Sequence, residues 1–147
     1  MTIYLILQNI RSFHNVGSIF RTADAMGVKK IYLSGFTPDP ASKTALGAEK
    51  YVEYEKVKNT QKLIRQLKVD GFFIVSIEQS KNSVDIRKFA KREIKKTALI
   101  LGNEVRGISK SILQKSDAVV EIPMRGKKES LNVSVATGMA LYAIINS

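Results

Sequence analysis

The chain has 147 residues, so we expect a single domain, spanning residues 1–147, that is large enough to bury a substantial core. Hydrophobic residues make up 44% of the chain and charged residues 25%, a balance that excludes a mainly disordered protein. Lys and Arg total 24 against 13 Asp and Glu, and the resulting net charge of +11 favours a polyanionic partner, nucleic acid before an acidic membrane.

The chain contains no cysteine, which excludes disulfides, Cys-ligated zinc, iron–sulfur clusters and a thiol nucleophile. His14 is the only histidine, so metal motifs with two histidines are excluded, and we expect no metal. The first twelve residues do not resemble a secretory signal, and we expect a cytoplasmic protein. Residues 130–147 carry no charge, but their Ser, Asn and Thr residues favour a helix buried in protein over a membrane span.

Short apolar runs alternate with helix-like segments along the chain. The runs predict strands at residues 3–7, 30–34, 72–77, 97–101 and 118–122. Helical spacing of apolar residues, with suitable end signals, predicts helices at 16–26, 60–67, 109–114 and 132–145. Because the strand runs are continuous rather than alternating, we expect an α/β fold with a mainly parallel sheet and helices on both faces. Ligands of such sheets bind at the carboxyl ends of the strands.

Three loops at these carboxyl ends carry polar and glycine residues. The first contains Asn15, and Arg21 follows it nearly two turns into a helix whose N-terminus suits an anion. A simple N-cap for Asn15 and a solvated charge for Arg21 are the alternatives. The second loop contains Gly102, where a backbone can approach a ligand closely, and Gly107, which suits a turn. The third, residues 122–132, is basic and ends in residues that can cap the last helix.

Several phosphate-binding and hydrolytic motifs are absent. No two glycines are two residues apart, so GxGxxG cannot occur, and neither a Walker A loop nor a GxSxG elbow is present. A nucleotide-binding α/β protein of the usual kinds is therefore disfavoured.

Together the three loops resemble the three motifs of the SpoU (TrmH) family of SPOUT-class RNA ribose methyltransferases. The matching segments are Asn15-x-Gly17-x-x-x-Arg21, Leu101-Gly102-x-Glu104-x-x-Gly107, and Ile122-Pro123-Met124 through Ser130-Leu131-Asn132-Val133-Ser134-Val135-Ala136, and together they span residues 15–136. The resemblance implies a C-terminal trefoil knot, a homodimer, S-adenosylmethionine as the methyl donor and a ribose 2′-hydroxyl of tRNA or rRNA as the acceptor.

The resemblance also implies roles for individual residues. The catalytic positions would be Arg21, Asn15, Glu104, Ser130 and Asn132. The cofactor would be bound by Ser76, Ile77, Glu78, Leu101, Gly102, Asn103, Gly107, Ile122, Met124, Ser130, Leu131 and Asn132. Independently of the resemblance, we expect the RNA to be bound by basic residues that flank the proposed pocket, Arg106, Arg125, Lys127 and Lys128, together with Arg21. No N-terminal RNA-binding extension is expected, so RNA capture would depend on the surface of the dimer.

Several alternatives stay open at this point. Arg21 would be either the proton acceptor or a phosphate clamp, and arginine's permanent charge favours the clamp. A non-catalytic RNA-binding module and a SPOUT base methyltransferase are the rival functions. A further basic run lies at residues 87–96. If it is helical, Arg87, Lys91 and Lys95 share one face, and it is either an RNA contact or a solvated charged surface.

Overall fold

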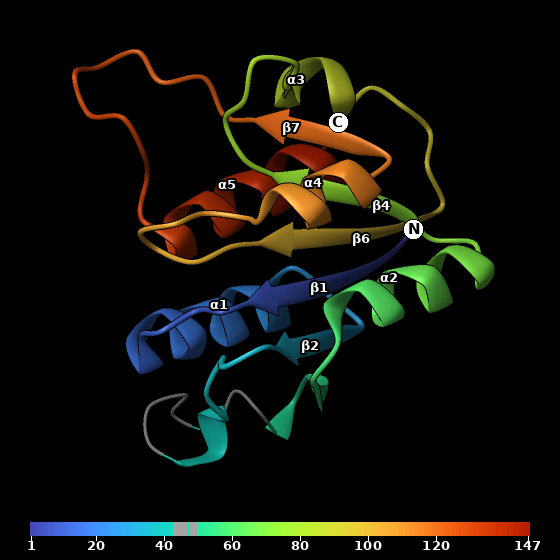
Figure 1. Ribbon diagram of the computed structural model, residues 1–147, viewed down its shortest axis with the longest axis vertical. Helices are drawn as coiled ribbons and strands as arrows, with labels where there is room; N and C mark the ends of the chain where they lie inside the picture. Colours follow the sequence, from blue (N-terminus) through green and yellow to red (C-terminus); the bar gives the residue numbers. More distant parts are fainter. Residues whose placement is uncertain (43–46, 48–49) are drawn as a thin grey trace.

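The computed structural model describes residues 1–42, 47 and 50–147, and its centre is a seven-stranded parallel sheet (Figure 1). The strand order is β3-β2-β1-β6-β4-β7-β5, and every neighbouring pair is parallel. The strands are β1 (Thr2–Gln8), β2 (Lys30–Ser34), β3 (Glu53–Val57), β4 (Phe73–Ile77), β5 (Val84–Asp85), β6 (Lys96–Leu101) and β7 (Ala118–Glu121). The predicted α/β class and all five predicted strands are confirmed.

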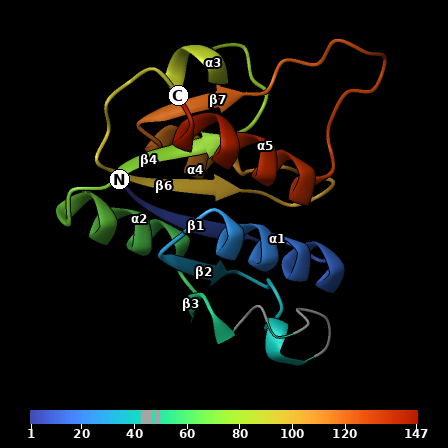
Figure 2. The ribbon, with the colours of Figure 1, turned by 180° about the vertical axis from the view of Figure 1, so that it is seen from behind.

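Helices cover both faces of the sheet, as predicted. They are α1 (Phe13–Ala25), α2 (Thr60–Val69), α3 (Ile86–Phe89), α4 (Lys110–Lys115) and α5 (Val133–Ile145), with a short 3-10 turn at Pro40–Ser42. Figures 1 and 2 show α1 and α5 side by side on one face and α2 and α4 on the other. Alternate residues of a strand point to opposite faces of the sheet and pack against different helices. Leu5 and Leu7 pack with α1 and α5, whereas Ile6 packs with α2 and α4. Burial on both faces explains why the central strands read as continuous apolar runs.

Polar side chains determine where the longer helices begin. The Ser12 hydroxyl accepts a hydrogen bond from the Asn15 backbone N–H at 3.2 Å, so α1 begins three residues earlier than predicted. Asn15 is therefore inside the first turn, and the alternative that it is the N-cap is wrong. Gly27 lies just beyond the helix at φ 75°, the left-handed conformation expected of a helix stop.

Besides the 3-10 turn, three elements within the described residues were not predicted. β3 is an edge strand in which three of the five residues are charged, and β5 has only two residues. α3 ends at Phe89, so Lys91 and Lys95 lie beyond it in turns and loop. The condition under which they would share a helical face with Arg87 is therefore not met, because α3 is a single turn.

Neighbouring connections diverge at β1 and β6. β1 and β6 are adjacent, yet β1 leads into α1 on one face and β6 leads toward α4 on the other. When the connections after two adjacent strands run to opposite faces of the sheet, a crevice forms at the carboxyl ends of those strands. The trefoil knot implied by the family resemblance stays a prediction. Among the described residues, no helix is both long and apolar enough to span a bilayer.

Candidate active site

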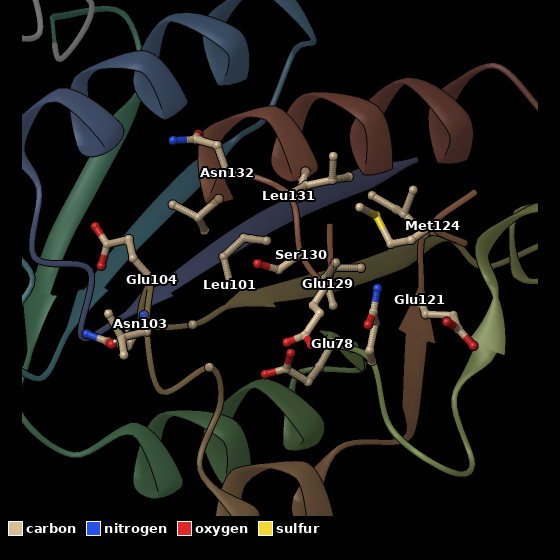
Figure 3. Close-up of a pocket in the computed structure, with 18 residues that line it drawn as sticks. Glu78, Leu101, Asn103, Glu104, Glu121, Met124, Glu129, Ser130, Leu131 and Asn132 are labelled. Carbon is tan, nitrogen blue, oxygen red and sulfur yellow. Dashed lines mark hydrogen bonds between the residues drawn. The ribbon is translucent and has the colours of Figure 1, made fainter. Parts of the chain in front are cut away.

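A pocket of about 640 Å³ lies at the carboxyl ends of β4, β6 and β7 and the start of α5 (Figure 3). Eighteen residues line it: Ile77, Glu78, Gln79, Leu101, Gly102, Asn103, Glu104, Val105, Gly107, Glu121, Ile122, Met124, Glu129, Ser130, Leu131, Asn132, Val133 and Ala136. The second and third sequence motifs thus form the walls of one cavity.

Eleven of the twelve predicted cofactor residues line this pocket, and the exception is Ser76. Ser76 is fully buried, and its hydroxyl lies 2.6 Å from that of Ser116. The sequence interpretation missed Glu121 and Glu129, among others. Both directly precede residues that were predicted, so a search one residue to either side would have found them.

A chain of side-chain hydrogen bonds joins the three motifs at the pocket. The Asn15 amide donates to the Glu104 carboxylate at 3.0 Å, and the Asn132 amide donates to the Asn15 carbonyl oxygen at 3.2 Å. The Asn132 Oδ1 in turn accepts from the backbone N–H groups of Ser134 and Val135, at 2.8 and 3.3 Å, and caps α5. We call Asn15, Glu104 and Asn132 the amide relay. Its members are up to 117 residues apart in the sequence.

Glu104 also binds the backbone that leads into α1. Its carboxylate accepts from the Arg11 N–H at 2.9 Å and from the Ser12 N–H at 3.0 Å. Burial alone would raise the pKa of Glu104, but the hydrogen bonds from Arg11, Asn15 and Ser12 outweigh burial and lower it. The Glu104 side chain is therefore ionised at neutral pH, and its hydrogen bonds link the loop after β6 to the start of α1.

The loop after β6 is folded tightly against itself and against Glu78. A Cβ on Gly102 would lie 2.6 Å from the backbone carbon of Gly107 and 2.7 Å from the nitrogen of Ile108. A side chain at position 102 would clash with its own loop, so the packing of the loop alone explains why this residue is glycine. Close approach to a ligand, the role expected from the sequence, is not required to explain it. The Glu78 carboxylate accepts from the Ile108 N–H at 2.8 Å and closes this side of the pocket.

Asn103 stabilises the same loop from within. Its Oδ1 accepts from the backbone N–H groups of Val105 and Arg106, both at 2.9 Å, and its amide donates to the Asn9 carbonyl at 2.7 Å. Asn103 lines the pocket, but the polar atoms of its side chain are occupied by the protein. Its contribution to a ligand site is therefore to shape the loop.

Carboxylates gather at the pocket although the chain as a whole is strongly basic. Glu78, Glu104, Glu121 and Glu129 are in its lining, and the lining formed by the described residues contains no Lys or Arg (Figure 3). Such a lining favours a ligand that carries positive charge and disfavours a phosphate. No group of three or more metal-ligating side chains is found in the described part of the chain.

The sequence profile of the SpoU rRNA Methylase family matches residues 2–142. The chain belongs to this family. It is 39% identical over 137 residues to the tRNA (guanosine(18)-2′-O)-methyltransferase of Aquifex aeolicus, covering 91% of this chain and 64% of that protein. It is 33% identical to a putative TrmH-family tRNA/rRNA methyltransferase of Bacillus subtilis, covering 96% of this chain and 57% of that protein. The chain therefore spans less than two thirds of the length of these curated relatives.

Solved structures of SpoU proteins have the same fold. The A. aeolicus TrmH/SpoU tRNA modifying enzyme superimposes with a TM-score of 0.87 at 36% identity, covering 98% of this chain and 74% of that one. The AdoMet-bound rRNA methyltransferase from Sinorhizobium meliloti superimposes with a TM-score of 0.89 at 31% identity, covering 99% of this chain and 56% of that one. The likeness extends over the whole sheet and all three SpoU motifs.

The predicted RNA-binding side chains of this SpoU protein lie outside the pocket lining. Arg21 is exposed on α1, on the helix whose first turn carries Asn15. Arg106, Arg125, Lys127 and Lys128 are exposed on the two loops that flank the pocket. Ser130 lines the pocket and is also exposed. Carboxylates therefore line the pocket, and exposed Lys and Arg side chains lie on the surface around it.

Proposed function

We propose that this SpoU-family chain is an RNA methyltransferase that transfers the methyl group of S-adenosylmethionine to a ribose 2′-hydroxyl. The observation that carries the proposal is the amide relay, which joins all three family motifs beside one pocket through Asn15, Glu104 and Asn132. The names of the relatives support the same reaction class, because the A. aeolicus protein is a tRNA 2′-O-methyltransferase.

The residues of the pocket fit S-adenosylmethionine. The volume of about 640 Å³ is in the range of small-molecule sites. Apolar side chains, including Ile77, Leu101, Ile122 and Leu131, offer surfaces for an adenine ring, while the carboxylates complement the positive sulfonium and ammonium groups. When bound, S-adenosylmethionine supplies an electrophilic methyl group on its sulfonium.

The protein's own residues would position the acceptor hydroxyl. Glu104 and the relay hold the start of α1 against the pocket, which places the helix that carries Arg21 beside it. A guanidinium stays charged in proteins, so we infer that Arg21 clamps an RNA phosphate and stabilises negative charge that develops on the 2′-oxygen. Alignment of the acceptor with the methyl donor would supply much of the rate enhancement.

We also propose that the protein acts as a homodimer through α5. Val135, Met139 and Tyr142 are 49%, 47% and 65% exposed, and their spacing places them on one face of this helix. A twofold contact with a second copy would cover this stripe. The acceptor would be tRNA or rRNA, the two classes that appear in the relatives' names.

The test is to incubate the protein with unfractionated tRNA or rRNA and methyl-labelled S-adenosylmethionine, digest the RNA and identify the labelled nucleosides. Label in 2′-O-methyl nucleosides is the expected result, and Arg21→Ala should abolish it while leaving S-adenosylmethionine affinity unchanged. Label in a methylated base would replace the proposal with a base methyltransferase. RNA binding without any label would replace it with a non-catalytic RNA-binding module.

A further inference from the structure

A second concentration of positive charge lies in the connection from the carboxyl end of β5 to the amino end of β6. Residues 86–96, from α3 to the start of β6, contain six Lys or Arg residues and a single carboxylate, Glu93. We call this stretch the basic segment. The family motifs and the proposed catalytic chemistry leave it without a role.

Three of its lysines carry charge that the protein does not neutralise. Arg87 is paired with Asp85, and this contact includes a bond from the Arg87 Nε at 3.0 Å. Lys88, Lys91 and Lys95 are exposed, and none forms an ion pair within the described ranges of the chain. Exposed ammonium groups without an ion pair are available to attract an anionic ligand.

Two further cations are held in place by aromatic rings. The Arg92 guanidinium lies 4.8 Å from the centroid of Phe73 and 5.8 Å from that of Phe89, while the side chain as a whole is exposed. The Lys96 ammonium lies 5.5 Å from the centroid of Phe72 and donates to the Asp70 carbonyl at 3.0 Å. Cations ordered in this way lose less side-chain entropy when they bind a ligand.

Figure 1 shows that the connection from α3 ends at the amino end of β6, whereas the pocket lies at the carboxyl ends of the strands. Lys95 and Lys96 help to line an open hollow of about 680 Å³ at the amino ends of β4, β6 and β7. β6 joins the two ends, and its six residues, Lys96–Leu101, correspond to about 20 Å at ~3.3 Å per residue. The separation applies to this end of the basic segment, so a ligand that reached both the pocket and Lys95 or Lys96 would be a macromolecule.

We propose that the basic segment binds the phosphate backbone of the RNA substrate at a distance from the methylated ribose. This inference rests on the proposed function for the identity of the RNA. Phosphate contacts fix the register of a nucleic acid without reading its sequence, which suits exposed lysines. A membrane fits less well, because Ile86 and Phe89 are buried and the basic segment has no large, exposed apolar side chain to enter a bilayer.

The test compares two triple variants of the full chain. The first replaces Lys88, Lys91 and Lys95 with Gln. The matched control replaces Lys56, Lys58 and Lys62 with Gln; these residues are also exposed but lie on β3, in the loop after it and in the first turn of α2. Both remove three charges, and circular dichroism checks that both remain folded. The measurements are affinity for unfractionated tRNA and for unfractionated rRNA from 50 to 200 mM salt, S-adenosylmethionine affinity, and the KM and kcat of methyl transfer.

We expect the first variant to lower the slope of log affinity against log salt by about 2–3, because each lost phosphate contact removes ~0.7–0.9. RNA affinity at low salt should fall on the order of tenfold and the KM for RNA should rise, with kcat and S-adenosylmethionine affinity unchanged. The control should shift the slope by less than about 1. Equal effects of the two variants on RNA would overturn the proposal.

Two other results would separate this inference from the proposed function. Loss of binding to vesicles rich in phosphatidylserine, with RNA affinity intact, would make the basic segment a membrane surface and overturn the proposal. RNA binding that depends on Lys88, Lys91 and Lys95 without any methyl transfer would support the basic segment and defeat the proposed activity.

Discussion

Gly107 is expected to support both stability and ligand binding, and Gly107→Ala tests this. Its φ is 68°, and a Cβ there would lie 2.2 Å from the Oε2 atom of Glu78. That oxygen accepts the hydrogen bond from the Ile108 N–H at 2.8 Å. An alanine would therefore take up a left-handed backbone and also displace the carboxylate from its partner.

Gly27→Ala separates these two costs, because Gly27 has a φ of 75° but nothing within 4 Å of the added Cβ. A left-handed alanine costs about 1–2 kcal/mol, partly offset by the lower entropy of the unfolded chain, so Gly27→Ala should lose about 1 kcal/mol. Gly107→Ala should lose a further ~1.5–3 kcal/mol, the usual contribution of a hydrogen bond to a charged group.

Urea denaturation gives the two free energies of unfolding, and titration calorimetry gives S-adenosylmethionine affinity. Gly107→Ala should lose both stability and affinity, whereas Gly27→Ala should keep its affinity. Equal losses of stability in the two variants would show that the added Cβ does not cost the hydrogen bond between Glu78 and Ile108, and the reasoning would be refuted.

Three further predictions concern charge and assembly. Because the pKa of Glu104 is lowered in the fold, its contribution to stability is complete above its ordinary value near 4.5 and is lost as the pH falls through the lowered value. Urea titrations at several pH values should therefore show a shallower acid loss in Glu104→Gln than in wild type. Arg21→Lys should keep partial methyl transfer if Arg21 is a phosphate clamp, and activity as low as in Arg21→Ala would identify a geometry that only the guanidinium provides. Tyr142→Glu should shift a sedimenting dimer to monomer, and an unchanged dimer would exclude α5 as the interface.

The central strands could be predicted from the sequence because burial on both faces requires apolar residues along their whole length. Helices cover β1, β4 and β6 on both faces, so most of their side chains are buried and their sequences are continuous apolar runs. β3 lies at the edge, where Glu53, Glu55 and Lys56 stay exposed, and its pairing with β2 leaves no apolar signal in the sequence. Its position depends on tertiary contact rather than on local pattern.

The candidate site was predictable as a set of loops but not as a set of contacts. Parallel strands bring their carboxyl ends to one edge, which is enough to place the motifs of Asn15, Glu104 and Asn132 together. Ser76 shows the limit of this rule. It lies near the end of β4, but alternate residues face opposite sides of a sheet, and its side chain packs against Ser116 instead of reaching the pocket. The backbone partners of Glu104, Arg11 and Ser12, are more than 90 residues away in the sequence and leave no local signal.

The amide relay also has a direction that the charge of Glu104 fixes. An ionised carboxylate can only accept hydrogen bonds, so Asn15 must turn its NH₂ group toward Glu104 and its oxygen away. That oxygen can only accept from Asn132, whose NH₂ group must therefore face Asn15. The Oδ1 of Asn132 is then directed to the first free N–H groups of α5, where a helix needs an acceptor. One negative charge in the second motif thus orients the amides of the first and third motifs. Removing that charge should disturb the cap of α5 as well as the loop that carries Glu104.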